Sequence, residues 1–157
     1  MRAMLAEGSQ APEFTLLRMD GSTISSTEIA QNGPALLVFF KISCPTCQFT
    51  FPFLERLSKN SKLQVIGVSQ NDAEGTAEFN QACGISFPIL LDSEETGFKA
   101  SNGFGISHVP SMFVMEPDGK ISTAEQGFTK LLLEELGERA GVAVFSPAEK
   151  IPLYKPG

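Results

Sequence analysis

The chain has 157 residues, a net charge of -6 at pH 7 and 42% hydrophobic residues. This length fits a single domain over residues 1–157, and the apolar content is enough to bury a core, which excludes a largely disordered protein. The acidic balance argues against a nucleic-acid partner, because phosphates attract clustered Lys and Arg. No apolar run approaches the roughly 18 residues that a membrane span needs.

The N-terminal sequence bears on the compartment. Residues 1–8 lack the apolar core of a signal peptide. As written, the sequence therefore predicts a cytoplasmic location. A periplasmic or other extracytoplasmic location would mean that a signal or anchor had been removed.

The cysteines point to redox chemistry. Cys44 and Cys47 have the Cys-x-x-Cys spacing, Cys83 is isolated, and His108 is the one histidine. Three cysteines are too few for a disulfide scaffold. A structural zinc site takes about four Cys or His ligands, which this set does not readily supply. We therefore expect neither a metal nor a cofactor.

The N-terminal part predicts a β-hairpin, a short helix and a buried strand. Asp20-Gly21 is the turn signal of the hairpin, and Ser26 is the expected helix cap. Six consecutive apolar residues, 35–40, follow the breaker Gly33-Pro34 and predict a strand buried on both faces. The hairpin strands and the helix are expected at residues 13–17, 23–25 and 26–30.

The middle of the chain alternates helices and strands. Pro45 suits the first turn of a helix over residues 45–59, whereas Pro52 lies inside that helix and should kink it. Gly84 is the expected end of the next helix. Strands are predicted at residues 63–68 and 88–91, and further helices at 73–82 and 94–100.

The C-terminal part predicts a second hairpin, a closing helix and a tail. Residues 116–119 form a Glu-Pro-Asp-Gly turn between strands 111–115 and 120–125. Residues 129–140 are an amphipathic helix, and residues 142–157 are expected to lie over the surface. Strands that alternate with helices predict an α/β sandwich around a mixed sheet.

The pair Cys44 and Cys47 lies where a buried strand ends and a helix begins. Free N–H groups and the helix dipole stabilise a thiolate at that position. Cys47 faces the same side one turn later, so a disulfide between the two closes with little movement. These facts predict that Cys44 attacks a substrate disulfide and that Cys47 resolves the mixed disulfide.

The sequence resembles the thioredoxin-fold redoxins similar to the TlpA/ResA thiol-disulfide oxidoreductases of the AhpC/TSA superfamily. The resemblance implies a three-layer α/β/α sandwich with a mixed central sheet, an N-terminal β-hairpin, and an inserted helix-strand segment at about residues 73–103. The stretches that carry it lie in the family's order at residues 8–16, 20–23, 37–52, 65–69, 87–92, 109–114 and 117–121.

The resemblance also implies further site residues and partners. Pro110 would be a cis-proline that faces the cysteines, and Val109 would offer backbone groups to a bound substrate. The substrate would be a protein or small-molecule disulfide or dithiol, with reduction favoured over oxidation, and an upstream electron donor would complete the cycle. Neither partner is identified by the sequence.

Some family positions carry other residues. Ser43 replaces the Trp that often precedes the first cysteine, and Val38 and Thr50 stand where relatives place acidic proton-transfer residues. Lys41 and His108 remain as candidates for tuning the pKa of Cys44 by positive charge. The alternative is that both are ordinary solvated side chains.

Two other functions stay open. A peroxiredoxin-type thiol peroxidase would need Pro at the position of Leu37, Ser or Thr at that of Lys41, and a later Arg to bind peroxide. A non-catalytic thioredoxin-fold binding module would not use the sulfurs.

Cys83 is expected to be a small apolar residue, with a third redox role as its alternative. Phe51 is expected in the core, with an apolar docking surface as its alternative.

Overall fold

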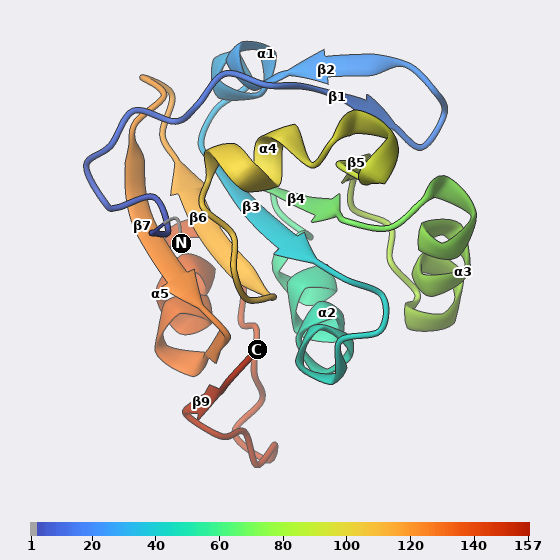
Figure 1. Ribbon diagram of the computed structural model, residues 1–157. Helices are drawn as coiled ribbons and strands as arrows, with labels where there is room; N and C mark the ends of the chain where they lie inside the picture. The colour runs from blue at the N-terminus through green and yellow to red at the C-terminus, as the bar shows by residue number, and fades with distance from the viewer. Residues whose placement is uncertain (1–2) are drawn as a thin grey trace.

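The computed structural model describes residues 3–157, so the first two residues of the predicted domain lie outside the described part. Within that part, seven strands form a mixed sheet in the order β2-β1-β5-β4-β3-β6-β7 (Figure 1). The pairs β3–β4 and β4–β5 are parallel and the others are antiparallel. The strands are β1 (Thr15–Arg18), β2 (Thr23–Ser25), β3 (Ala35–Phe40), β4 (Gln64–Ser69), β5 (Ile89–Leu91), β6 (Ser111–Met115) and β7 (Ile121–Gln126).

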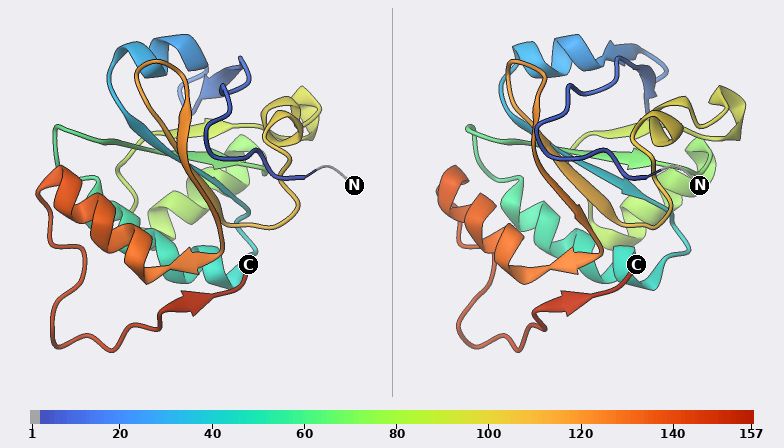
Figure 2. Two further views of the ribbon diagram at one scale, coloured as in Figure 1. Left: turned by 90° about the vertical axis from the view of Figure 1, so that its left-hand side faces the viewer. Right: turned by 60° about the vertical axis from the view of Figure 1, so that its left-hand side comes forward.

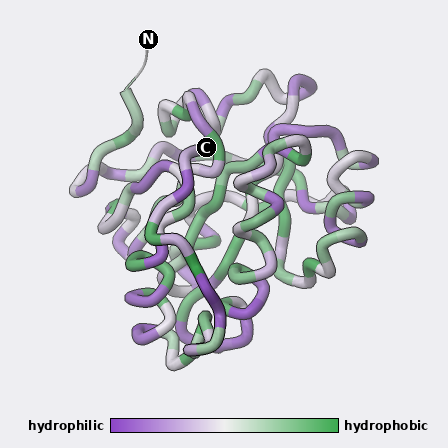
Figure 3. The backbone as a smooth tube through the Cα atoms, turned by 90° about the horizontal axis from the view of Figure 1, so that it is seen from below, coloured by the Kyte–Doolittle hydropathy of each residue, from purple (hydrophilic) through white to green (hydrophobic). Residues whose placement is uncertain are grey.

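Helices cover both faces of the sheet, which gives the predicted three-layer α/β/α sandwich (Figures 1 and 2). One face packs against α2 (Pro45–Leu57), α3 (Ala73–Cys83) and α5 (Lys130–Ala140), and the other against α1 (Ser26–Gln31) and α4 (Lys99–Gly103). None of the helices within residues 3–157 has both the length and the apolar composition of a membrane span. The hydrophobic stretches gather inside the backbone trace (Figure 3).

The central strand β3 joins the two halves of the core. Leu36, Val38 and Phe40 pack toward α2, α3 and α5, whereas Leu37 and Phe39 pack toward α1 and α4. All five side chains are fully buried. Burial of each such side chain contributes about 1.5–3 kcal/mol. These contacts hold β3 in the sheet and so fix the position at which the chain leaves the sheet toward Cys44.

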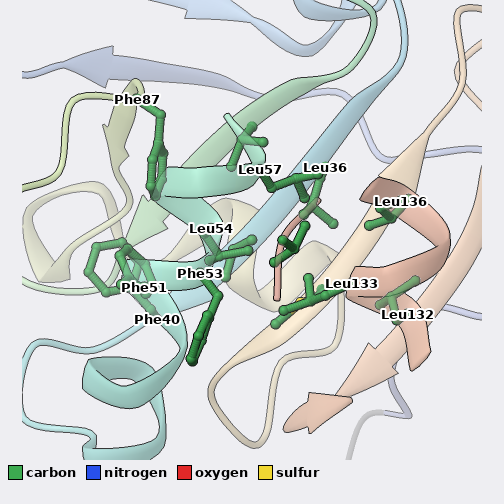
Figure 4. Packing of buried hydrophobic residues seen from close by; sticks show 14 of the residues in the cluster. Leu36, Phe40, Phe51, Phe53, Leu54, Leu57, Phe87, Leu132, Leu133 and Leu136 are labelled. Atoms are coloured by element: carbon green, nitrogen blue, oxygen red, sulfur yellow. The ribbon is translucent and has the colours of Figure 1, made fainter. Parts of the chain in front are cut away.

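Phe51 lies inside this core rather than on the surface. Its ring centroid is 4.3 Å from that of Phe40, 5.2 Å from that of Phe79 and 5.7 Å from that of Phe87. The side chain is fully buried in the cluster between β3, α2 and α3 (Figure 4). The alternative of an exposed docking surface at Phe51 is therefore wrong. The helix α2 runs on through Pro52 to Leu57.

The cap of α1 corrects the sequence prediction by one residue. Ser25, not Ser26, is the N-cap: its hydroxyl accepts from the Glu28 N–H at 3.1 Å, and the Glu28 carboxylate accepts from the Ser25 N–H at 3.1 Å. This reciprocal pair is a capping box. The buried Ser26 hydroxyl instead accepts from the Phe14 N–H at 3.0 Å.

The single helix predicted over residues 94–100 is two short ones. A 3₁₀ turn, η1 (Glu94–Thr96), ends at Gly97, and α4 follows after Phe98. Both intervening residues have left-handed backbones, with φ of 67° and 51°. The buried Asp92 carboxylate accepts from the backbone N–H groups that open α4, at 3.3 Å from Ala100 and 2.6 Å from Ser101.

The C-terminal segment 142–157 packs below α2 and α5 and returns to the cysteine end of the molecule (Figure 2). Val144 is buried, and Glu149 forms an ion pair with Arg56 at 2.7 Å. Its end forms β9 (Tyr154–Lys155), which pairs antiparallel with β8 (Phe128–Thr129).

Candidate active site

The first cysteine forms the N-cap of α2. The strand β3 ends at Phe40, and Cys44, with φ of −81° and ψ of 116°, turns the chain into the helix. Pro45 follows at the first helical position, where its missing N–H costs nothing. The Cys44 sulfur accepts a hydrogen bond from the Cys47 N–H at 3.1 Å. The Cys44 sulfur therefore lies at the N-terminus of α2, where the positive end of the helix dipole faces it.

The second cysteine differs from the first in its exposure. Cys47 is fully buried, whereas Cys44 is half-buried, and both are free thiols. Burial raises the pKa of the Cys47 thiol well above its ordinary value, and its hydrogen bond with Cys44 adds to the rise, against a smaller lowering by the Lys41 backbone. Cys44 is thus the sulfur open to a substrate, and Cys47 lies behind it as a protonated thiol.

A second loop brings backbone groups to Cys44. The Val109–Pro110 peptide bond is cis, as the resemblance implied. The Cys44 thiol donates to the Val109 carbonyl, with sulfur and oxygen 3.4 Å apart. The Gly127 N–H donates to the Pro110 carbonyl at 2.7 Å, and the Ser111 hydroxyl donates to the His108 carbonyl at 2.6 Å. These bonds hold the loop against the cysteines.

Two polar side chains that sequence reasoning missed hold the loop before Cys44. The Asn71 side-chain oxygen accepts from the Ile42 N–H at 2.9 Å, and the Gln48 amide donates to the Ile42 carbonyl at 3.0 Å. Asn71 follows β4, so it links the ends of two neighbouring parallel strands. Its pairing with Ile42 spans 29 positions of the chain, and no local sequence signal indicates it.

The two candidate tuning cations lie at the surface. Lys41 and His108 are exposed, and the His108 Nδ1 pairs with the Ser107 hydroxyl at 2.9 Å. Among the described residues, neither side chain forms a hydrogen bond or an ion pair with a cysteine. Their tuning of Cys44 stays a prediction.

The positions of the missing acidic residues are both interior. Val38 and Thr50 are fully buried, and the Thr50 hydroxyl donates to the Thr46 carbonyl at 2.6 Å within α2. Within residues 3–157, no group of three or more His, Cys, Asp or Glu side chains is placed to hold a metal ion.

Cys83 lies apart from this pair. It is the last residue of α3, half-buried against the core, and burial raises the pKa of its thiol. Its packing fits the apolar role expected of it.

The C-terminal segment supplies contacts that the sequence analysis did not foresee. The Thr46 hydroxyl, between the two cysteines, donates to the Pro156 carbonyl at 2.6 Å. Gly157 packs on the backbone of Val109 so closely that an added Cβ would lie 2.1 Å from the Val109 oxygen.

Comparison with known proteins agrees with this geometry. The model of the AhpC/TSA family matches residues 8–124. The chain belongs to the AhpC/TSA family. It is 30% identical over 142 residues to the thiol-disulfide oxidoreductase ResA of Halalkalibacterium halodurans, covering 87% of this chain and 78% of the relative. This AhpC/TSA protein is therefore a ResA-like redoxin and a thiol-disulfide oxidoreductase, which confirms the family, fold and enzyme class inferred from the sequence.

Two further matches bear on the fold and on the alternatives. The thioredoxin domain of a thiol-disulfide oxidoreductase from Bacteroides vulgatus superposes with a TM-score of 0.75 at 20% identity, covering 87% of this chain and 99% of that domain. A Mycobacterium tuberculosis protein named "Putative peroxiredoxin Rv2521" is 30% identical over 135 residues, covering 77% of this chain and 85% of that protein. Relatives of this chain thus carry either name.

Proposed function

We propose that the protein reduces disulfides, with Cys44 as the attacking sulfur, Cys47 as the resolving sulfur, and the Val109–Pro110 backbone as the substrate platform. One observation carries the proposal: the half-buried Cys44 sulfur caps α2 and lies 3.4 Å from the Val109 carbonyl oxygen, while Cys47 is buried behind it. A sulfur so placed is at a helix N-terminus, accessible to a substrate and beside its partner sulfur.

The reaction balances as two exchanges. The Cys44 thiolate attacks one sulfur of a substrate disulfide, and the other substrate sulfur leaves as a thiolate that takes a proton from water. Cys47 then attacks the Cys44 sulfur, which forms the Cys44–Cys47 disulfide and releases the second substrate thiol. Two electrons and two protons pass to the substrate in total.

The proton on Cys47 distinguishes this site from one with a buried carboxylate. Burial raises the pKa of Cys47, and Val38 and Thr50 occupy the positions where an acidic helper would stand. We infer that Cys47 gives its proton to the departing substrate thiolate during the second exchange, because that sulfur becomes basic as the new disulfide forms.

The cycle needs two partners. The substrate supplies a disulfide, on a protein or a small molecule, and an upstream dithiol must return two electrons to the oxidised enzyme. We propose reduction as the net direction. The compartment, cytoplasmic or extracytoplasmic, stays a prediction.

Reduction of insulin disulfides tests the proposal, with dithiothreitol as electron donor and turbidity of the released B chain as readout. The wild type and a Cys83→Ser control should accelerate reduction, Cys44→Ser should not, and Cys47→Ser should accumulate a mixed disulfide visible by mass. Activity that survives Cys44→Ser would overturn the mechanism. No acceleration by the wild type would favour the non-catalytic binding module.

Peroxide reduction is the second candidate, favoured by the 30% identity to the mycobacterial protein named above. Leu37 and Lys41 stand where a peroxidase needs Pro and a hydroxyl residue, and no Arg lies between Arg56 and Arg139. We expect hydrogen peroxide consumption with a dithiol donor to stay at the rate of the Cys44→Ser control. Consumption well above that control would favour the peroxidase.

A further inference from the structure

The last four residues, 154–157, which we name the C-terminal strap, run as an added strand beside the site. Within the strap, Tyr154 pairs with Thr129 and Lys155 with Phe128, antiparallel, and the Lys130 N–H donates to the Leu153 carbonyl at 2.9 Å just before it. The strand β8 directly follows Gly127, whose N–H holds the Pro110 carbonyl. The strap therefore extends the structure next to the cis-proline loop.

The strap contacts both sides of the active site. On one side, the Pro156 carbonyl accepts from the Thr46 hydroxyl at 2.6 Å, and Thr46 lies between the two cysteines. On the other side, Gly157 lies on the Val109–Pro110 backbone: a Cβ there would be 2.1 Å from the Val109 oxygen and 3.3 Å from the Pro110 nitrogen. That same Val109 oxygen accepts the Cys44 thiol.

Side-chain contacts also hold the strap and the segment that leads into it. The Lys155 ammonium lies 4.6 Å from the centroid of the Phe49 ring, on the side of α2 that faces β8. Farther back, Arg56 binds Glu149 through two hydrogen bonds at 2.7 and 2.9 Å and the Val144 carbonyl at 3.0 Å. Yet Pro156 and Gly157 are exposed, and one hydrogen bond and one backbone packing contact join them to the site.

We propose that the C-terminal strap is a specificity-determining segment that occupies the place of a substrate polypeptide beside Cys44. An extended polypeptide binds a folded protein best by adding to an exposed strand edge through backbone groups. Here the strap already pairs with β8 and lies on the Val109–Pro110 backbone. A protein substrate must therefore displace the strap before a substrate sulfur reaches Cys44. A small disulfide reaches the half-buried Cys44 sulfur without displacing the strap. The inference rests on the proposed reductase function.

The test compares two substrates in full-length variants. Gly157→Val places a side chain against the Val109 backbone and should push the strap off the site, whereas Ala148→Val adds bulk to an exposed position of the same C-terminal segment, away from the site. The reduced proteins are mixed with insulin or with oxidised glutathione, and the second-order rate constant of thiol oxidation is measured for each.

We expect Gly157→Val to react about fivefold faster with insulin, because displacement no longer costs the contacts of one hydrogen-bonded segment. Its rate with oxidised glutathione should equal that of the wild type, and Ala148→Val should match the wild type with both substrates. Equal acceleration with both substrates would overturn the proposal, since it would show altered reactivity of Cys44 rather than specificity. No change with insulin would overturn it as well.

A measurement independent of activity tests the placement of the strap. In a protein with Cys47→Ser and Cys83→Ser, mild oxidation of Pro156→Cys, which keeps the backbone carbonyl that Thr46 binds, should join position 156 to Cys44, whereas Ala148→Cys should not. Peptide mapping reports the disulfide. If it does not form, the strap does not lie at the site, and the inference fails even where insulin reduction succeeds. If it forms while the wild type reduces neither substrate, the reductase function fails instead.

Discussion

Two helix N-termini lie at the same edge of the sheet, and they share one geometry. The parallel strands β3 and β4 each run into a helix, and in each the N-cap side chain accepts from the backbone N–H three residues later. In α2 the cap is the Cys44 sulfur, 3.1 Å from the Cys47 nitrogen. In α3 the cap is the Asp72 carboxylate, 2.8 Å from the Gly75 nitrogen.

The two N-termini differ in what surrounds the cap. The first turn of α3 carries Glu74, whereas the first turn of α2 has no acidic residue to oppose a thiolate. The residue whose N–H donates to the cap is Cys47 in α2, which carries the second sulfur, and Gly75 in α3, which has no side chain. Only the α2 cap also meets the Val109 carbonyl. A helix N-terminus favours an anionic cap at either site, and the proposed function assigns the reactivity of Cys44 to the groups around it.

Exchanging the two caps gives the largest expected effect. Cys44→Asp keeps an anionic N-cap but removes the nucleophile, so disulfide reduction should fall to the uncatalysed rate while the fold is retained. Asp72→Cys places a sulfur at the matching position of α3 without a partner sulfur or a cis-proline. In the Cys44→Asp background it should restore no activity in the insulin assay. Restored activity would show that a helix N-terminus alone suffices.

Cys47 sharpens the comparison through its titration. Because burial raises the pKa of this thiol, its thiolate fraction keeps growing through the range where a free cysteine has already titrated. We expect the alkylation rate of Cys47 to rise about tenfold per pH unit from pH 7 to about 9.5 with no plateau, since only the thiolate reacts. The site is read by peptide mass. A plateau at or below pH 8.5, the range of a free cysteine, would contradict the burial.

Removing the α3 cap should cost stability but not chemistry. Asp72→Ala leaves the Gly75 N–H without its partner, and the free energy of unfolding should fall by about 1 kcal/mol. Urea unfolding measures the loss, and insulin reduction by the folded variant should match the wild type. A large loss of activity would show that α3 contributes to the reaction itself, through the Asn71–Ile42 link beside it.

The smallest effects are expected at the exposed cations. Lys41→Gln removes an ammonium and His108→Gln removes an imidazole from solvated positions near the site, where screening limits a charge interaction to about 1 kcal/mol at most. The rate of Cys44 alkylation at pH 7 should therefore change less than about fivefold in each variant. A larger drop for either one would establish it as a tuning residue.

Much of the α2 terminus could be predicted from the sequence. Six apolar residues after Gly33-Pro34 indicate a strand buried on both faces, and Pro45 indicates the first helical position, which together place Cys44 at the cap. These signals are local and depend on one strong physical requirement each: burial of apolar side chains, and the missing N–H of proline.

Two local errors had signals that were available. Ser25 rather than Ser26 stands three residues before Glu28, which is the spacing of a capping box. Gly97 marks the left-handed residue that divides the predicted helix after β5. In the first case two adjacent serines compete and the Glu28 side chain decides between them, whereas in the second a glycine with a left-handed backbone ends the turn.

The contacts around the site could not be predicted from local pattern. Thr46 meets Pro156 across 110 positions of the chain, and Ile42 meets Asn71 across 29. Such pairs depend on how the completed fold returns distant segments to one place. The approach of the C-terminal strap to Cys44 is therefore visible only in the structure.

The midpoint potential of the Cys44–Cys47 pair tests the central claim most directly. The protein would be equilibrated in dithiothreitol or glutathione redox buffers, and alkylated thiols would be counted by peptide mass. We predict one reversible two-electron couple in which Cys44 and Cys47 oxidise together while Cys83 stays alkylated, with a potential nearer to about −270 mV than to about −120 mV. The absence of a reversible couple, or a disulfide to Cys83, would contradict the account.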